Sequence, residues 1–246
     1  MEGYNLSKRL SCVAEWIKDT GSKRVADIGT DHGYLPIYLA GNGIADKVIA
    51  MDVRPQPLSK AKNNIRSFGV EDKVSVRLSD GLEKLEPGEV DAVTICGMGG
   101  RLIRSILSNG RGKFDGNTQL ILSPQSEVKE FREFLAGSGY SVIREHFLKE
   151  DNKYYTIMDC RYNPDFELFL RYGKDNLVSR NEDLHQYLKK ELDVNLRILD
   201  AVSKAGASER MTQVSEDIYY IRKALVDYYE DNVIGTCERK AESVRQ

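Results

Sequence analysis

The chain has 246 residues, a formal net charge of −2 at pH 7 and 41% hydrophobic residues. This apolar content can form one domain of ordinary size and a smaller annex. The chain contains no run of about 18 apolar residues, which argues against a membrane-spanning helix. Its four cysteines form no C-x-x-C pair, so we expect neither a metal site nor a disulfide framework. The low net charge argues weakly against an RNA partner, because a local basic patch can bind RNA.

The first 21 residues lack the apolar core of a signal peptide, and their pattern predicts an amphipathic helix. Together with the cysteine pattern, this favours a cytoplasmic protein.

The segment from Val25 to Ala40 is the most informative part of the chain. Val25–Ile28 is typical of the end of a buried strand, and a turn from Gly29 to Gly33 leads into an apolar run. Gly29 can adopt the angles of a tight turn and lets a ligand approach the main chain. Pro36 lies about one turn into the following helix, where its missing N–H costs little. A strand, a glycine turn and a helix N-terminus together predict a nucleotide site.

The pattern favours S-adenosylmethionine (SAM) over a dinucleotide. The glycine spacing is G-x-x-x-G and not G-x-G-x-x-G, and Asp27 and Asp31 at the edges of the turn would repel a pyrophosphate. Carboxylates suit SAM, which carries an ammonium, a sulfonium and a ribose. The apolar strand Lys47–Val53 places Asp52 about twenty residues beyond the turn, where an acid usually binds ribose hydroxyls. Asp27 or Asp52 alone could be a helix cap, but their joint placement at strand ends favours a site.

Strands and helices alternate from about residue 24 to residue 162. We expect strands at 24–28, 47–53, 73–78, 90–96, 119–123, 140–147 and 153–162, the last two forming an antiparallel hairpin around residues 149–152. Five strand–helix units followed by a hairpin predict an α/β fold with a mostly parallel, Rossmann-like, seven-stranded sheet. Ligands bind at the carboxyl ends of such strands, where Asp27, Gly29, Asp52, Asp80 and the Cys96–Gly100 loop should converge.

From Pro164 onward the pattern becomes helical. Leucines recur at helical spacing from Leu184 to Leu199, and a heptad seam runs from Met211 to Tyr228. Two such helices joined by a short turn should pair as an antiparallel, coiled-coil-like hairpin. We therefore expect a SAM-binding domain at 1–163 and a helical domain at 164–246. The second segment has 13 basic and 16 acidic residues, so it is not a basic arm. It could clamp a macromolecular partner by shape or mediate dimerisation.

Several motifs resemble one known family. They are D-I-G-T-D-H-G-Y-L-P (27–36), S-D-G-L (79–82), C-G-M-G-G (96–100) and E-D-N-K-Y-Y (150–155). In this order they are similar to the bacterial tRNA (adenine-N1)-methyltransferase family that modifies adenine 22, and the similarity covers nearly the whole chain. The resemblance implies a class I SAM-dependent methyltransferase fold, a helical C-terminal extension and a tRNA substrate.

The resemblance also implies roles for residues at the strand ends. Gly29 would allow close backbone approach, Asp27 or Asp31 would hold the methionine end of SAM, and Asp52 would bind the ribose. The adenine edge of SAM would be recognised by Asp80 with the Gly81 N–H. The floor below the sulfonium would be lined by Cys96 and Gly97. The bare loop at Gly99 and Gly100 would leave room for a flat base.

Methyl transfer to N1 of adenine demands little acid–base chemistry, because N1 has its own lone pair. The loop G-M-G-G carries no carboxylate or amide, which disfavours methylation of the exocyclic N6. The N1 product is cationic, and Asp31 is the first candidate to stabilise it, with His32 and Tyr34 as neighbours. Alternatively, His32 could have a purely structural role, in which it hydrogen-bonds the backbone at the start of a helix. Tyr34 could stack on the target base or pack on the sheet.

Further residues are candidates for substrate contact. A methionine such as Met98 more often fills the core than contacts a base. Tyr154 and Tyr155 alternate along a strand, so we expect one in the core and the other exposed near the site. Lys153 and Gln125 are weaker candidates. A target base must leave its stack to reach a methyl donor, and the remaining affinity should come from basic residues on phosphates. The predicted basic patch consists of Arg101, Arg104, Arg111 and Lys113, extended by Lys8, Arg9, Lys23 and Arg24.

The sequence thus predicts a SAM-dependent tRNA (adenine-N1)-methyltransferase. Two alternatives stay open: a SAM methyltransferase for another RNA or a small molecule, and an RNA-binding protein that senses SAM without turnover. The helical annex favours a macromolecular substrate over a small one.

Overall fold

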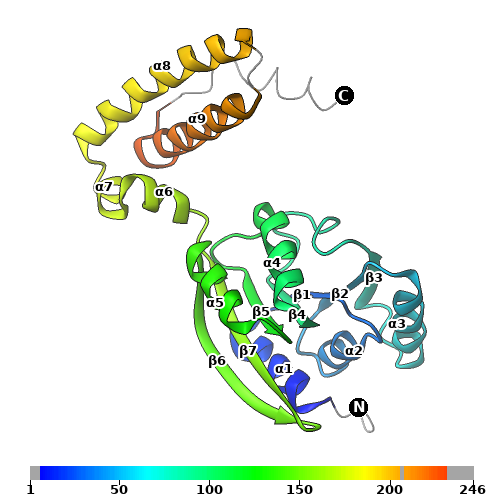
Figure 1. Ribbon diagram of the computed structural model, residues 1–246. Coiled ribbons are helices and arrows are strands. Elements are labelled where there is room, and N and C mark those ends of the chain that lie inside the picture. The colour runs from blue at the N-terminus through cyan, green and yellow to red at the C-terminus, as the bar shows by residue number, and fades with distance from the viewer. Residues whose placement is uncertain (1–5, 206–207, 232–246) are drawn as a thin grey trace. The chain divides into compact units, whose positions relative to one another are not determined.

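Seven strands form one mixed sheet in the order β3-β2-β1-β4-β5-β7-β6 (Figure 1). The structure is a computed structural model that describes residues 6–205 and 208–231. The strands are β1 (Arg24–Ile28), β2 (Lys47–Asp52), β3 (Val74–Leu78), β4 (Ala92–Met98), β5 (Gln119–Pro124), β6 (Tyr140–Glu150) and β7 (Lys153–Tyr162). β1 to β5 pair in parallel, and β7 runs antiparallel to both β5 and β6. The predicted α/β sheet is confirmed.

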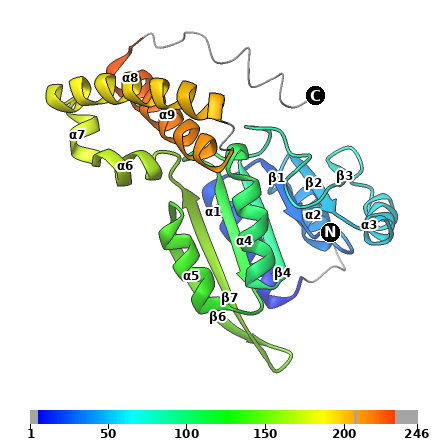
Figure 2. The same ribbon diagram turned by 45° about the horizontal axis from the view of Figure 1, so that its top comes forward.

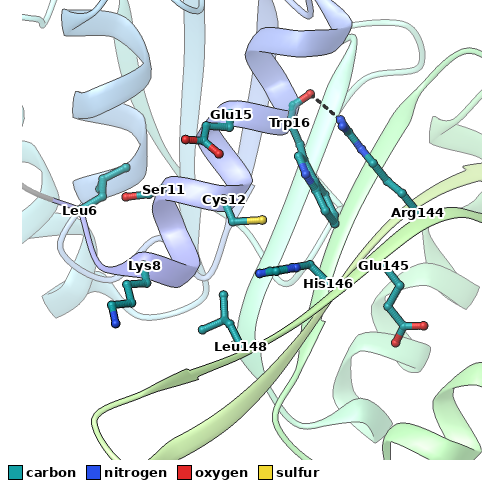
Figure 3. Close-up of a pocket in the computed structure, with 10 residues that line it drawn as sticks. All are labelled: Leu6, Lys8, Ser11, Cys12, Glu15, Trp16, Arg144, Glu145, His146 and Leu148. Atoms are coloured by element: carbon teal, nitrogen blue, oxygen red, sulfur yellow. Dashed lines mark hydrogen bonds between the residues drawn. The ribbon is translucent and has the colours of Figure 1, made fainter.

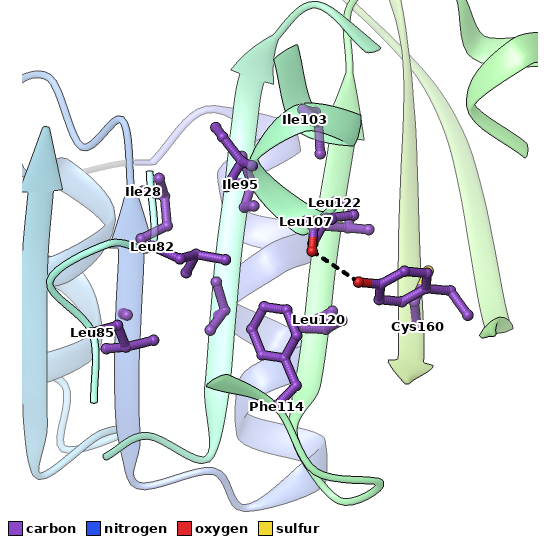
Figure 4. Close-up of a cluster of buried hydrophobic side chains, with 14 of the residues drawn as sticks. Ile28, Leu82, Leu85, Ile95, Ile103, Leu107, Phe114, Leu120, Leu122 and Cys160 are labelled. Carbon is purple, nitrogen blue, oxygen red and sulfur yellow. Dashed lines mark hydrogen bonds between the residues drawn. The ribbon is translucent and has the colours of Figure 1, made fainter. Parts of the chain in front are cut away.

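Helices cover both faces of this sheet. They are α1 (Lys8–Thr20), α2 (Tyr34–Gly41), α3 (Pro55–Ser67), α4 (Gly100–Asn109) and α5 (Val128–Gly137), with a 3₁₀ turn η1 (Arg111–Lys113) after α4. α4 and α5 lie in front of the sheet in Figure 2. Ile103 and Leu107 of α4 belong to one buried cluster with Ile95 and Leu122 of the sheet (Figure 4). The other face holds a second cluster with residues of α1, α2 and α3.

This double coverage explains the composition of the central strand. In β1, Val25 and Ala26 are fully buried and Ile28 is 2% exposed. A parallel strand covered on both faces needs apolar residues without alternation, which is the pattern that the sequence shows.

α1 begins and ends at sequence signals of its own. Ser7 caps its start by accepting a hydrogen bond from the Leu10 N–H through Oγ at 3.3 Å. Gly21 ends it with a left-handed φ of 70°. The predicted N-terminal helix is therefore present over Lys8–Thr20, and residues 1–5 lie outside the described residues.

The hairpin of β6 and β7 is longer than predicted. The strands extend to Glu150 and from Lys153, so the turn is only Asp151 and Asn152. Both turn residues have positive φ, 47° and 60°, as a two-residue hairpin turn matched to the strand twist requires. The expected four-residue turn is wrong, because Asp and Asn tolerate left-handed angles and allow the ladder to continue two residues further.

The structure divides the chain into two units between Pro164 and Asp165. The second unit contains α6 (Phe166–Tyr172), α7 (Lys174–Val178), α8 (Glu182–Ala205) and α9 (Ser208–Tyr229). The two short helices α6 and α7 were not predicted, because each is too short for a helical period to stand out.

α8 and α9 run antiparallel, since the end of α9 meets the start of α8. The Tyr229 hydroxyl donates to the Asn181 carbonyl at 3.0 Å, and His185 Nε2 lies 2.7 Å from Asp231 Oδ2. Their shared core contains Leu188 of α8 together with Val214 and Ile218 of the predicted seam. Within the described residues, no helix is long and apolar enough to cross a membrane.

Candidate functional site

The turn after β1 is folded tightly against the end of β2. Gly29, Asp31 and Gly33 all have left-handed φ values, 75°, 49° and 74°. The N–H groups of Gly29 and Thr30 donate to the Met51 carbonyl at 2.8 and 2.9 Å. A Cβ on Gly29 would lie 2.2 Å from the Met98 methyl carbon, so a side chain here would displace Met98. The sequence needs glycine at Gly29 for both its angles and its space.

Contacts between neighbouring strand ends place the predicted residues along one edge of the sheet. The Ser79 N–H after β3 donates to the Asp52 carbonyl at 3.0 Å. Gly29 contacts the end of β2 and faces Met98 at the end of β4. The Gln125 N–H after β5 donates to the Met98 carbonyl at 2.9 Å. The carboxyl ends of β3, β2, β1, β4 and β5 are thus joined in this order.

Asp52 is the last residue of β2 and is only 5% exposed. Its Oδ1 accepts a hydrogen bond from the Arg54 N–H at 2.9 Å, and the Arg54 Nε lies 3.6 Å away. A nearly buried carboxylate needs hydrogen-bond donors, and two vicinal hydroxyls are suitable donors. This observation fits a ribose at the end of β2.

Asp27 lies in the middle of the sheet and is 7% exposed. Its Oδ1 accepts a hydrogen bond from the Thr94 hydroxyl at 2.6 Å. Burial raises the pKa of Asp27 above its usual value, while the Thr94 hydrogen bond and the positive charge of Arg9 oppose the rise. Arg9 of α1 therefore reaches the same edge as Asp27.

Asp31, His32 and Tyr34 lie together at the exposed start of α2. His32 Nε2 is 3.5 Å from Asp31 Oδ2, and the rings of His32 and Tyr34 are stacked with centroids 5.2 Å apart. The His32 carbonyl accepts a hydrogen bond from Asn64 Nδ2 at 2.9 Å, which attaches the turn to α3. The side chain of Asp31 is 59% exposed, so it can reach a substrate at the surface.

Comparison with known proteins agrees with this geometry. A family profile described as "Methyltransferase domain" matches residues 6–158. The tRNA (adenine(22)-N(1))-methyltransferase of Bacillus subtilis is 42% identical over 158 residues, which span 64% of this chain and 66% of that protein. The crystal structure of the B. subtilis M1A22 tRNA methyltransferase TrmK is 32% identical, covers 91% of this chain and 100% of its own, and superposes with a TM-score of 0.62. The chain belongs to the TrmK-type tRNA m1A22 methyltransferase family.

A further member of the TrmK-type family carries a ligand. The structure of M. capricolum TrmK in complex with the natural cofactor product S-adenosyl-homocysteine (SAH) is 32% identical, with 89% of this chain and 97% of that chain covered and a TM-score of 0.58. The sheet order of the present chain is the class I methyltransferase order, as the resemblance implied.

The TrmK-type loop after β4 differs from our expectation at Gly100. Gly100 is buried, and a Cβ on it would lie 2.6 Å from the Ser126 carbonyl oxygen. Gly100 therefore has no open face for a base, because the segment after β5 covers it. Gly97 has a φ of 85° and Gly99 remains partly exposed, so bare backbone is accessible only before α4. Burial raises the pKa of the neighbouring Cys96 thiol to about 12, so it stays protonated at neutral pH.

The Asp80–Gly81 loop follows β3 at the same edge as Asp52. Asp80 is exposed, whereas Gly81 is buried with a φ of 49°. A Cβ on Gly81 would lie 3.0 Å from two carbons of Ile106, so α4 packs directly on this loop. Asp80 is thus the accessible member of the predicted pair.

The predicted basic patch does not form one surface. Arg101 and Arg104 lie in the first turns of α4 beside the site, and Arg101 pairs with Glu127 at 3.0 Å. Arg111 and Lys113 follow the far end of α4, about 15 Å along its axis. Their closeness in the sequence hid this separation, because a helix carries its two ends to opposite edges of the sheet.

Lys23 and Arg24 also lie at the edge opposite the site. Arg24 begins β1, at the amino ends of the parallel strands, and pairs with Asp91 at 2.6 Å. Lys8 and Arg9 are at the other end of α1, where the Lys8 N–H bonds to Glu150 of the β6–β7 hairpin. Of the proposed extension, only Lys8 and Arg9 belong to the site edge.

The hairpin brings Tyr155 to the site and leaves Lys153 at the tip. Tyr155 lies under the Arg9 guanidinium, 5.1 Å from its carbon to the ring centroid. Tyr154 is 63% exposed and stacks on Phe147, whereas Tyr155 is partly buried, so the two tyrosines alternate but neither is a core residue. Lys153 is exposed at the first position of β7, beyond Tyr155 along the strand.

A separate groove of about 600 Å³ lies between α1 and β6 (Figure 3). Cys12 and Trp16 line it from α1, and His146 and Leu148 from β6. Arg144 closes one end by lying over the Trp16 ring at 4.6 Å and donating to the Trp16 carbonyl. None of the SAM-site candidates lines this groove.

Proposed function

We propose that this protein transfers the methyl group of SAM to N1 of adenine 22 in tRNA, in the cytoplasm. The observation that carries the proposal is the buried carboxylate of Asp52 beside the Gly29 turn, in a chain that belongs to the TrmK-type family. The adenine position is taken from the named activity of the Bacillus relative. The three described cysteines are free thiols, in keeping with a reducing compartment.

The chain's residues divide the work along the sheet edge. When bound, SAM supplies a methyl group on a positively charged sulfur. Asp52 binds the ribose hydroxyls, and Asp80 with the Gly81 N–H contacts the adenine of the cofactor. Gly29, Cys96 and Gly97 leave the backbone accessible below the sulfonium. The protein mainly aligns the reacting atoms and excludes water, and such alignment can lower a barrier by roughly 7–11 kcal/mol.

The target adenine needs no general base, because the N1 lone pair is already available. Asp31 stands at the mouth of the site and balances the positive charge that N1 methylation creates in the base. The stacked rings of His32 and Tyr34 form an aromatic surface beside Asp31 on which a flipped base can lie. Met98, Gln125 and Tyr155 border the same space from the other strand ends.

The test is methylation of bulk bacterial tRNA with labelled SAM, followed by digestion to nucleosides. We expect label in 1-methyladenosine, and loss of that label when adenine 22 of a tRNA transcript is replaced by guanine. Label in N6-methyladenosine would contradict the proposed geometry. SAM binding without any transfer would favour the sensor alternative.

We expect the Asp31→Asn substitution to lower kcat about tenfold, because one opposite charge near the cationic product is lost. Asparagine tolerates the left-handed φ of 49° at this position, so the turn should be retained. Single-turnover rates with saturating tRNA would measure the effect.

A backbone control separates charge from strain at this position. Asp31→Gly also keeps the turn and removes the carboxylate, so it should lose as much activity as Asp31→Asn. Wild-type rates in both variants would remove Asp31 from the mechanism.

A further inference from the structure

The tip of the β6–β7 hairpin projects beyond the other strands at the edge that holds the site (Figures 1 and 2). The pairing of β7 with β5 runs to Leu122 opposite Met158. Tyr154 lies four residues further along β7, whereas β5 ends two residues later, at Pro124. At about 3.4 Å per residue, Tyr154 is therefore roughly 7 Å beyond the end of β5. Because β5 and β6 both run antiparallel to β7, the tip lies at the carboxyl ends of the parallel strands.

This tip carries an exposed pair of aromatic rings. Phe147 and Tyr154 are 65% and 63% exposed, and their rings stack with centroids 5.6 Å apart and an interplanar angle of 6°. Lys149 is directly opposite Tyr154 in the ladder, and its Nζ lies 5.6 Å from the centre of the Tyr154 ring. Opposed residues share a face of the hairpin, as do alternate residues of one strand, so all three side chains lie on one face.

The face that carries this pair is the one that α5 covers nearer the base of the hairpin. Glu145, two residues before Phe147 on the same face, pairs with Arg132 of α5. The alternate residues Leu148 and Tyr155 lie on the opposite face, toward α1. Beyond Glu145 the α5 face is exposed at Phe147, where a large apolar surface meets water. Exposed apolar patches of this kind often mark interaction sites.

The position of the aromatic pair indicates which ligand it meets. In the sheet, β2 and β1 lie on one side of β4, and β5 and the hairpin lie on the other. Asp52, the candidate ribose ligand, is at the end of β2, so the substrate should approach from the side of the hairpin. A target base in the site is joined to neighbouring nucleotides, which leave the site past the tip. Aromatic rings stack on any base, and a lysine beside them suits a phosphate.

We propose that Phe147 and Tyr154 form a stacking platform for an unpaired base next to the methylated adenine, with Lys149 at the adjoining phosphate. This inference rests on the proposed tRNA substrate and adds a contact outside the methyl-transfer pocket. A second copy of the chain fits this face less well. In a two-fold contact the same patch meets itself, so the two Lys149 ammonium groups would be brought together.

The test separates a flat ring from a merely apolar side chain. Tyr154→Leu keeps an apolar residue and removes the ring, whereas Tyr154→Phe keeps the ring. We expect Tyr154→Leu to weaken binding of a tRNA transcript that contains adenine 22 about tenfold, and Tyr154→Phe to change it less than about twofold. Fluorescence anisotropy with saturating SAH measures tRNA binding, and calorimetry should show unchanged SAH affinity in both variants.

An abasic nucleotide in the tRNA identifies the stacked base. Placed on one side of adenine 22, it should weaken wild-type binding as much as Tyr154→Leu does. The same abasic tRNA should bind wild type and Tyr154→Leu equally, because the contact is already lost. Placed on the other side, it should leave the effect of Tyr154→Leu intact.

Two further variants control for surface aromaticity and for charge. Phe68→Leu makes the same kind of change at an exposed ring just after α3, at the opposite edge of the sheet, and should bind tRNA normally. Lys149→Gln should weaken tRNA binding more at 50 mM than at 200 mM salt, because it removes one phosphate contact. Thermal unfolding should be unchanged in Tyr154→Leu, since the side chain is 63% exposed.

The possible results are distinct. Wild-type tRNA affinity in Tyr154→Leu would overturn the inference, and so would an equal loss in Phe68→Leu. Additive losses from Tyr154→Leu and an abasic nucleotide on either side would also overturn it. A wild-type dimer that Tyr154→Leu dissociates, with tRNA affinity unchanged, would overturn it in favour of self-association. A wild type that binds no tRNA would overturn it together with the proposed function. Selective loss of tRNA affinity in a chain that forms no 1-methyladenosine would support the platform and contradict only the proposed function.

Discussion

Asp52→Ala is expected to weaken SAH binding about 100-fold. The substitution removes a buried carboxylate that we assign to two ribose hydroxyls, and two charge-assisted hydrogen bonds are together worth about 3 kcal/mol. Asp52 is 5% exposed at the end of β2, so water can replace it only poorly. Calorimetric titration of SAH into each variant measures the loss.

Two controls separate the ribose contact from local structure. Asp52→Asn keeps an oxygen that can accept the Arg54 N–H, and it should fall between alanine and the wild type. Asp46→Ala removes an exposed acid just before the same strand, at the opposite edge, and should bind SAH normally. If Asp52→Ala binds SAH within twofold of the wild type, the ribose assignment is wrong.

Gly100→Ala is expected to destabilise the first unit by about 1–3 kcal/mol, the range for forcing an extra carbon into a packed site. The new Cβ would lie 2.6 Å from the Ser126 carbonyl oxygen and 3.2 Å from that of Glu127. Both contacts are backbone, so no side chain can turn aside. The Gly100 N–H also donates to the Ser126 carbonyl at 3.1 Å, which holds the two segments together.

Urea unfolding followed by tryptophan fluorescence measures this effect. The single tryptophan, Trp16, lies in the first unit, so the signal excludes unfolding of the helical unit. Gly112→Ala is the matched control, because its Cβ would meet nothing within 4 Å. We expect it to change stability by less than about 0.5 kcal/mol. Equal urea midpoints for the two variants would contradict the prediction. They would show that the loop after β5 moves to make room for the new Cβ at position 100.

The sheet could be predicted because its signals are local. β1 is apolar without alternation, and Gly29, Asp52 and Asp80 lie at the carboxyl ends of β1, β2 and β3. Both the covered faces and the site edge therefore follow from the order of elements. The α8–α9 pair was predictable for the same reason, through repeated spacing of Leu188, Val214 and Ile218. α6 and α7 were missed, because a helix of five to seven residues has too few turns to show a period.

The errors at the site all involve distances across the fold. Arg101 and Arg111 look like one patch in the sequence, yet α4 separates them by its length. Gly100 looks like free space for a base, yet the Ser126 backbone fills that space. Arg9 looks like an exposed basic residue, yet its Nε is buried beside the end of β4. No local pattern encodes these three facts.

The sequence by itself determined the strands, their order along the chain, the left-handed turn at Gly29 and the family to which the motifs are similar. These features depend on backbone angles and on the period of apolar residues, which neighbouring residues set. Only the tertiary structure decided which charges face the site, because burial and pairing arise when α1, α4 and the β6–β7 hairpin pack on the sheet. The burial of Arg9 Nε and Nη1 beside the end of β4, for example, arises from that packing alone.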